Sequence, residues 1–248
     1  MDGLRTFYES RGKGRALILI HGAGGMSSYW VNQLSELSKR LRVIAIDLPG
    51  HGKSERMKEK PTIEGYVRHV VGFMKQAKVA RGLIAGHSMG GVIVQLLALE
   101  HSELVERLII IDSGAKFQNL GDLPARIRHN PAEAGLQLLN RLLSPKMLTE
   151  GNLSSLMKYF RVEADFDPSI LANDFDALNG IDLSGRVKEI KVPTLIVCGA
   201  DDMLASSSAI LHESIEGSTL EMIFEAGHMP MIEQPDKFNK ILLDFIGR

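Results

Sequence analysis

Six short runs of Ile, Leu and Val recur along the chain, and they constrain the fold more than any other feature. The runs lie at residues 16–20, 43–47, 82–85, 108–112, 193–198 and 220–224. None alternates apolar with polar residues, so the runs resemble strands buried on both faces, as in parallel sheets covered by helices. Segments with apolar residues at helical spacing separate them, at 29–39, 63–78, 90–100, 206–215 and 236–246. We therefore predict an α/β fold with a doubly wound, mostly parallel sheet, whose functional side chains gather at the carboxyl ends of the strands.

The charge balance argues against a nucleic-acid partner. The chain has 29 Lys and Arg against 30 Asp and Glu in 248 residues, and no block of basic residues stands out. A surface that tracks phosphates needs such a block. We expect a small-molecule partner instead, and nothing in the sequence indicates an oligomeric state.

The single cysteine and the N-terminus favour a cytoplasmic location. Cys198 lies inside an apolar run and has no partner for an internal disulfide, so we expect it to be buried and inert. The first residues lack the apolar core of a signal peptide. No uninterrupted apolar run reaches the roughly 20 residues that span a bilayer, so we expect no membrane span.

One connection is longer than a simple crossover requires. Between residues 112 and 193 lie short amphipathic pieces at 125–128, 132–143, 153–160 and 169–178, separated by prolines. Long insertions with their own helices commonly serve as lids or binding elements. We therefore predict an α/β core at 1–115 and 187–248, with a helical cap at 116–186.

The predicted cap offers two kinds of pocket residue. Its large apolar side chains fit either an acyl pocket or the cap's own core: Phe117, Met147, Met157, Tyr159, Phe160, Phe166 and Phe175. Arg126, Arg128 and Arg141 could bind a substrate carboxylate, although solvated surface is the more usual place for such residues.

The strongest chemical signal is the pentapeptide Gly86-His87-Ser88-Met89-Gly90, which follows a predicted strand and precedes an apolar helix. A serine hydroxyl becomes a useful nucleophile when a sharp strand-to-helix turn presents it beside a base. Such a turn crowds the residues two positions before and after the serine, and here both are glycine. The helix N-terminus also favours developing negative charge. The pattern therefore predicts Ser88 as a nucleophile.

A second glycine-rich loop, His21-Gly22-Ala23-Gly24-Gly25, follows the predicted strand at 16–20. Acyl transfer creates an oxyanion that needs backbone N–H donors aimed at it in advance. We expect one donor from Met89, after the nucleophile, and a second from Ala23, with Gly24 as the alternative. A dinucleotide-binding loop is excluded because the glycine spacing G-x-G-x-x-G is absent.

The base and the acid must come from other loops at the same edge. Of the eight histidines, His228 fits best, because it follows the last predicted strand. We expect His69, among the histidines in helical stretches, to lie at the surface. Asp201 and Asp202 follow the preceding strand, and Asp112 follows an earlier one. Any of the three could orient the base.

In these features the chain resembles the α/β-hydrolase superfamily over nearly all of its length outside the cap. The matching segments are His21-Gly22, Asp47-Leu48-Pro49-Gly50-His51-Gly52-Lys53-Ser54, the turn at Ser88, Gly199-Ala200-Asp201-Asp202 and Gly227-His228. The resemblance selects Asp202 as the acid, because the family places it three residues after the glycine. It implies a structural role for the loop that carries His51.

The resemblance predicts a serine hydrolase that cleaves a carboxylic ester, lactone or thioester through an acyl-enzyme. Ser88, His228 and Asp202 would form the triad, and Ala23 and Met89 the oxyanion hole, with no metal or organic cofactor needed. Relatives that open epoxides carry Asp in place of Ser88, and carbon–carbon bond hydrolases often carry Asn in place of His87. Two alternatives stay open, since a fold does not determine a function. One is a cofactor-free lyase or carbon–carbon bond hydrolase on the same triad, and the other is a ligand-sensing signalling protein.

Overall fold

The computed structural model describes residues 3–117, 120–149, 156, 159 and 167–247. Among them, seven strands form one sheet in the order β1-β3-β2-β4-β5-β8-β9. Their bounds are β1 (Tyr8–Arg11), β2 (Ala16–Ile20), β3 (Arg42–Ile46), β4 (Gly82–His87), β5 (Val105–Ile111), β8 (Thr194–Gly199) and β9 (Thr219–Ile223). All neighbours pair in parallel except β1, which runs antiparallel to β3. The predicted fold class is confirmed.

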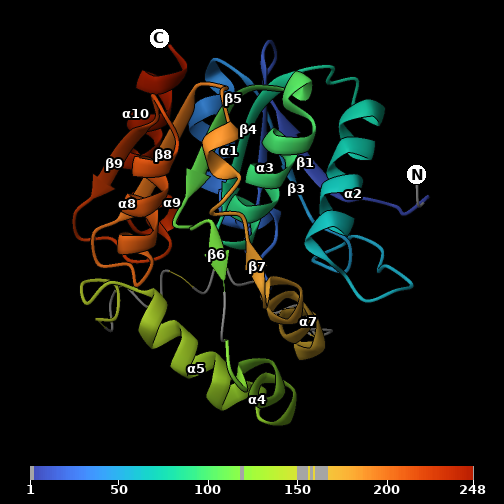
Figure 1. Cartoon of the computed structure of the whole chain (residues 1–248), viewed down its shortest axis with the longest axis vertical. Coiled ribbons are helices and arrows are strands. Elements are labelled where there is room, and N and C mark those ends of the chain that lie inside the picture. Colours follow the sequence, from blue (N-terminus) through green and yellow to red (C-terminus); the bar gives the residue numbers. More distant parts are fainter. Residues whose placement is uncertain (1–2, 118–119, 150–155, 157–158, 160–166, 248) are drawn as a thin grey trace.

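Helices cover both faces of this sheet (Figure 1). Those outside the 116–186 segment are α1 (Val31–Glu36), α2 (Ile63–Gln76), α3 (Met89–Glu100), α8 (Ala205–Ser214), α9 (Pro230–Glu233) and α10 (Pro235–Ile246). The helix predicted at 29–39 is instead a 3₁₀ turn, the short α1 and a second 3₁₀ turn. The other helices predicted outside that segment begin and end within two residues of their predicted bounds.

The strand side chains divide between two apolar clusters, one on each face of the sheet. In β2, Ile18 and Ile20 belong to one cluster and Leu17 and Leu19 to the other, and all four are fully buried. Full burial of such a side chain contributes about 1.5–3 kcal/mol. Because both faces need apolar residues, the strands show no polar alternation.

The described elements of the 116–186 segment lie below the carboxyl edge of the sheet (Figure 1). They are β6 (Lys116–Phe117), α4 (Leu123–His129), α5 (Pro131–Leu142), α7 (Pro168–Leu178) and β7 (Ile181–Asp182). Strands β6 and β7 pair antiparallel where the segment leaves and rejoins the rest of the chain. The predicted helix at 153–160, and with it Met157 and Phe160, lies mostly outside the described residues, as does Phe166. The division into core and cap stays a prediction.

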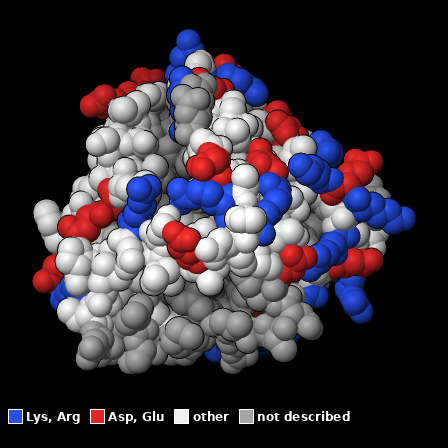
Figure 2. All heavy atoms as spheres, turned by 90° about the horizontal axis from the view of Figure 1, so that it is seen from below, with Lys and Arg blue, Asp and Glu red and all other residues white. Residues whose placement is uncertain are grey.

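The face that the 116–186 helices present carries both signs of charge in close alternation (Figure 2). Several of these groups are paired, including Arg56 with Asp167 and Arg128 with Asp176, each at 2.6 Å. Within the described part of the chain, no helix combines the length and the apolar character needed to cross a bilayer.

Candidate active site

Ser88 occupies a strained turn between β4 and α3. Its backbone has φ 54° and ψ −115°, a left-handed conformation that is rare for any residue but glycine. A Cβ on Gly86 would lie 2.1 Å from the Gly90 carbonyl oxygen, and one on Gly90 would lie 2.5 Å from that of Ile20. Both flanking glycines are therefore required by space. Ser88 is partly exposed, whereas all other residues from 82 to 98 are buried.

Hydrogen bonds from neighbouring strands and loops hold this turn in place. The Ser88 N–H donates to the Ile111 carbonyl oxygen at 2.9 Å. The Ser88 carbonyl oxygen accepts from the Gly91 N–H at 2.8 Å and from the Ser113 hydroxyl at 2.9 Å. A strained backbone persists when its surroundings over-determine it, and here three bonds do so.

The glycine-rich loop after β2 packs directly against Ser88. A Cβ on Gly22 would lie 2.9 Å from the Ser88 Cβ, so this loop can approach the serine only with glycine there. The Gly24 N–H already donates to the Asp174 carboxylate at 2.8 Å. Neither the Ala23 nor the Met89 N–H has an acceptor among the described backbone hydrogen bonds. Of the two expected donors in this loop, Ala23 is thus the one available to a ligand.

His228 and Asp202 lie together at the carboxyl edge of the sheet, in the loops after β9 and β8. The His228 Nδ1 is 3.0 Å from each Asp202 carboxylate oxygen. A carboxylate can only accept, so Nδ1 carries a proton and, in the neutral ring, Nε2 is free to take one. Burial opposes the charge on Asp202, but the hydrogen bond and charge of His228 lower its pKa below the usual value.

Two contacts fix the loop that carries His228. The His228 N–H donates to the Leu142 carbonyl oxygen, at the end of α5, at 2.6 Å. The His228 carbonyl oxygen accepts from the Nε2–H of His87 at 2.6 Å. The His87 and His228 rings lie 4.8 Å apart, which places His228 beside the residue that precedes Ser88.

His87 lies at the candidate site, although the sequence interpretation gave it no role. Its ring contacts the backbone of His228. Burial, followed by the nearby His228, lowers the pKa of His87 to about 3, so the ring is neutral. The signal that could have found it is its position next to Ser88, which faces the same sheet edge as the loop after β9.

The two other candidate acids do not contact His228. Asp201 is exposed. Asp112 is fully buried, and its carboxyl group accepts from the Gly199 N–H at 2.8 Å. Burial, followed by the nearby charge of Asp202, raises the pKa of Asp112 well above its usual range. The pKa shifts of the two neighbouring carboxyl groups thus have opposite directions, raised in Asp112 and lowered in Asp202.

Cys198 is buried in β8, as expected, 3.8 Å from an Asp202 oxygen. Ligand-type atoms of Asp112, Cys198 and Asp202 lie within 4.8 Å of one another. Burial raises the pKa of the thiol, which keeps its proton. The thiol and the two carboxyl groups therefore form a compact buried cluster behind His228.

Three further histidines are buried and hydrogen-bonded. His21 accepts from the Leu48 N–H at 3.0 Å, and burial lowers its pKa to about 3. His51 contacts Asp174 on α7 at 2.7 Å. His69 was expected at the surface; this was wrong, because its ring is buried against the Thr6 hydroxyl at 2.9 Å. Its position on the inner side of α2 explains the difference.

Three of the candidate pocket residues of the 116–186 segment contact other protein groups. Arg128 pairs with Asp176, and Arg126 donates to Gln137 at 2.8 Å. The Tyr159 hydroxyl accepts from Asn32 at 3.0 Å. These three side chains are thus engaged with protein groups.

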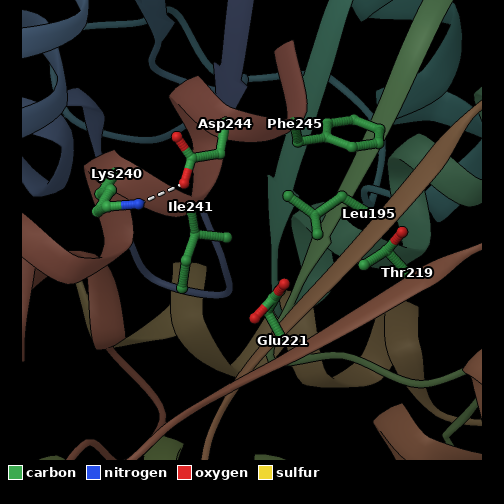
Figure 3. Close-up of a pocket in the computed structure, with 7 residues that line it drawn as sticks. All are labelled: Leu195, Thr219, Glu221, Lys240, Ile241, Asp244 and Phe245. Atoms are coloured by element: carbon green, nitrogen blue, oxygen red, sulfur yellow. Dashed lines mark hydrogen bonds and ion pairs between the residues drawn. The ribbon is translucent and has the colours of Figure 1, made fainter. Parts of the chain in front are cut away.

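Two surface cavities lie away from Ser88. One, of about 180 Å³, lies between β8, β9 and α10, toward the amino-terminal ends of the strands (Figure 3). It is lined in part by Leu195, Thr219 and Glu221, and Lys240 and Asp244 pair beside it at 2.6 Å. The other, of about 370 Å³, lies along α4 and α5. Neither is lined by a residue of the predicted triad.

Known proteins are similar to this chain over nearly its whole length. A 2-hydroxymuconate semialdehyde hydrolase of Pseudomonas sp. (strain CF600) is 29% identical over 259 residues, covering 99% of this chain and 91% of its own. The enol-lactonase from Burkholderia xenovorans LB400 superposes with a TM-score of 0.91 at 28% identity, covering 100% of this chain and 98% of its own. Est816, an N-acyl homoserine lactone degrading enzyme, superposes with a TM-score of 0.85 at 28% identity, covering 99% of this chain and 98% of its own. The model of the alpha/beta hydrolase family matches residues 17–241, and the chain belongs to that family.

Proposed function

We propose that this hydrolase cleaves an ester-type bond in a carboxylic ester, a lactone or a thioester. Among these three substrate classes, we propose lactones first. The observation that carries the proposal is the partly exposed Ser88 in its strained turn, with His228 nearby and paired to a buried Asp202. Two of the structural relatives at 28% identity are named for lactones, which is why lactones come first in the proposal.

In the proposed reaction, the Ser88 hydroxyl attacks the substrate carbonyl carbon while His228 Nε2 takes its proton. The N–H groups of Ala23 and Met89 stabilise the oxyanion, and Asp202 stabilises the imidazolium that forms. His228 then returns the proton to the leaving oxygen, which in a lactone stays attached to the acyl chain. Water repeats the sequence on the acyl-enzyme and releases the hydroxy acid.

The 116–186 segment is proposed to act as a cap that forms one wall of the substrate site. Its described helices lie over the carboxyl edge of the sheet, and two of its residues contact the loops of the site directly. These are Leu142, which binds the His228 N–H, and Asp174, which binds the Gly24 N–H.

A substrate panel tests the proposed function. Purified protein is assayed on N-acyl homoserine lactones, simple γ- and δ-lactones, p-nitrophenyl esters of graded length and acyl thioesters, with Ser88→Ala as the blank. We expect turnover of at least one lactone, unchanged after dialysis against EDTA. Loss of activity in EDTA that a divalent cation restores would contradict the cofactor-free mechanism.

A second candidate is hydrolysis of a substrate like 2-hydroxymuconate semialdehyde, on the same three residues. The relative of that name at 29% identity is the observation that favours it. Turnover of that compound with no turnover of any lactone, ester or thioester would select this candidate. Stabilisation by ligands without turnover of anything in the panel would select a ligand-sensing protein.

A further inference from the structure

A single carboxylate of the 116–186 segment reaches into the core beside the predicted oxyanion loop. Asp174 lies in the middle of α7 and is fully buried. One of its oxygens accepts from the Gly24 N–H at 2.8 Å and from His51 Nε2 at 2.7 Å. The other accepts from the Tyr66 hydroxyl at 2.7 Å. The donors come from the loop after β2, the loop after β3, and α2, so one side chain joins three parts of the core.

The arrangement keeps Asp174 charged in the interior. His51 Nδ1 faces the Pro49 carbonyl oxygen at 3.2 Å, and Nε2 faces Asp174. Neither partner can donate, so both ring nitrogens carry protons and His51 is a cation. Burial opposes both charges, but the pair raises the pKa of His51 and lowers that of Asp174. A buried charge is tolerated when it is paired and hydrogen-bonded in this way.

The same helix shapes the loop at Gly24. Gly24 has φ +63°, and a Cβ there would lie 2.7 Å from the Leu171 side chain, one turn before Asp174 on α7. The turn closes with a bond from the Gly25 N–H to the Gly22 carbonyl oxygen at 3.0 Å. With the Gly24 N–H held by Asp174, the neighbouring Ala23 N–H is left for a ligand beside Ser88.

We infer that Asp174 is a positioning residue: it holds Gly24 so that the Ala23 N–H points to the oxyanion. The inference rests on the proposed function. The inference goes beyond the proposed function because it makes the oxyanion hole depend on the docking of α7. The 116–186 segment thereby contributes to the chemistry as well as to the wall of the substrate site. Oxyanion stabilisation requires donors fixed in advance, and a loop without this anchor would lose that advantage.

Two substitutions at Asp174 separate positioning from charge. Asp174→Ala removes the acceptor for Gly24, so we expect kcat to fall on the order of tenfold to a hundredfold, with KM changed by less than about threefold. Asp174→Asn keeps an oxygen for Gly24, since the Tyr66 hydroxyl can turn to accept from the amide, and should retain kcat within about fivefold. Should Asp174→Ala not fold, Asp174→Glu keeps the charge but displaces the oxygens by one methylene, with the same expected loss.

The matched control is Asp176→Asn, two residues along the same helix. Asp176 ties α7 to Arg128 and Lys60, at 2.6 and 3.4 Å, away from Gly24. The Asp176→Asn variant should therefore keep the wild-type kcat. All variants are also titrated with two ligands. An alkyl boronic acid adds to Ser88 and mimics the tetrahedral oxyanion, whereas a product acid forms no tetrahedral adduct.

Boronate affinity should fall with kcat in Asp174→Ala, whereas affinity for the product acid stays constant. The inference fails if a folded Asp174→Ala keeps wild-type kcat, or if it loses product affinity as much as boronate affinity, the signature of a merely misdocked helix. A wild-type protein that neither turns over any ester or lactone nor binds boronate would instead overturn the proposed function.

Discussion

At the residue scale, two carboxyl groups at neighbouring strand ends take different states. Asp112 and Asp202 are both buried, but only Asp202 faces a cation-forming partner, His228. The raised pKa of Asp112 and the lowered pKa of Asp202 follow from that asymmetry. Of the two acids, the one next to the histidine is therefore the one whose charged form is favoured.

Replacing each acid by its amide tests this assignment. Asp202→Asn leaves His228 without its counter-charge and in the wrong tautomer, so kcat should fall on the order of a thousandfold or more. Asp112→Asn should cost far less, because an amide can replace a neutral carboxyl group beside Asp202. Steady-state kinetics on one substrate, with circular dichroism to check folding, decides it. A crippled Asp112→Asn beside a mild Asp202→Asn would move the acid to position 112.

At the element scale, the close approach of β2, β4 and α3 explains why the nucleophile turn needs its glycines. A Cβ on Gly90 would meet the carbonyl oxygens of Ile20 and His21 at 2.5 and 2.6 Å, and those atoms belong to a fully buried strand end. Backbone in the middle of a sheet cannot move away cheaply. By contrast, a Cβ on Gly135, in helix α5, would meet nothing within 4 Å.

These two helical glycines form a matched pair for alanine substitution. Gly90→Ala should lower the free energy of unfolding by about 3 kcal/mol or prevent folding, because two backbone groups must shift. Gly135→Ala should raise it by about 0.5–1 kcal/mol, the usual gain of alanine over glycine in a helix. Urea unfolding followed by circular dichroism measures both. Equal effects at the two positions would contradict the packing described for the turn.

The central strands and most helices could be predicted from the sequence because their apolar patterns are set by two buried faces. β1 was missed because its residues, Tyr8–Arg11, are mostly exposed and polar at the sheet edge. At the site, the strand-end motifs indicated Ser88 and His228, and the family resemblance selected Asp202 from three candidate acids. Asp174 was not predicted, because its role depends on where α7 docks, and no local pattern encodes a contact 150 residues away.

At the scale of the whole molecule, the His51–Asp174 pair links the 116–186 segment to the core, and its strength depends on pH. Because the pKa of His51 is raised on folding, its protonated ring adds to the free energy of unfolding. This contribution is complete below the unfolded-state pKa of about 6.5 and is lost as pH rises through the folded-state pKa. The lowered pKa of Asp174 adds stability present above its unfolded value of about 3.9 and lost as pH falls through the folded value. The His51–Asp174 pair therefore stabilises the fold most between about pH 3.9 and about pH 6.5, the unfolded-state pKa values of the two residues.

Comparison of wild type with His51→Gln across pH tests this link. The loss in unfolding free energy should be larger at pH 6 than at pH 9, because the stabilisation from a raised pKa falls as pH rises. Asp176→Asn, which alters only surface pairs of α7, serves as a control with little change between the two pH values. A loss that is the same at both pH values would show that His51 is not held as a cation.

The most direct test of the central claim, that Ser88 is the nucleophile, combines labelling with turnover. Wild type and Ser88→Ala are treated with a fluorophosphonate, digested and analysed by mass spectrometry, and both are assayed on the best substrate of the panel. We predict one adduct on Ser88 in the wild type and none in the variant, which stays folded and loses turnover by several orders of magnitude. A folded Ser88→Ala that keeps most of the wild-type kcat would contradict the account.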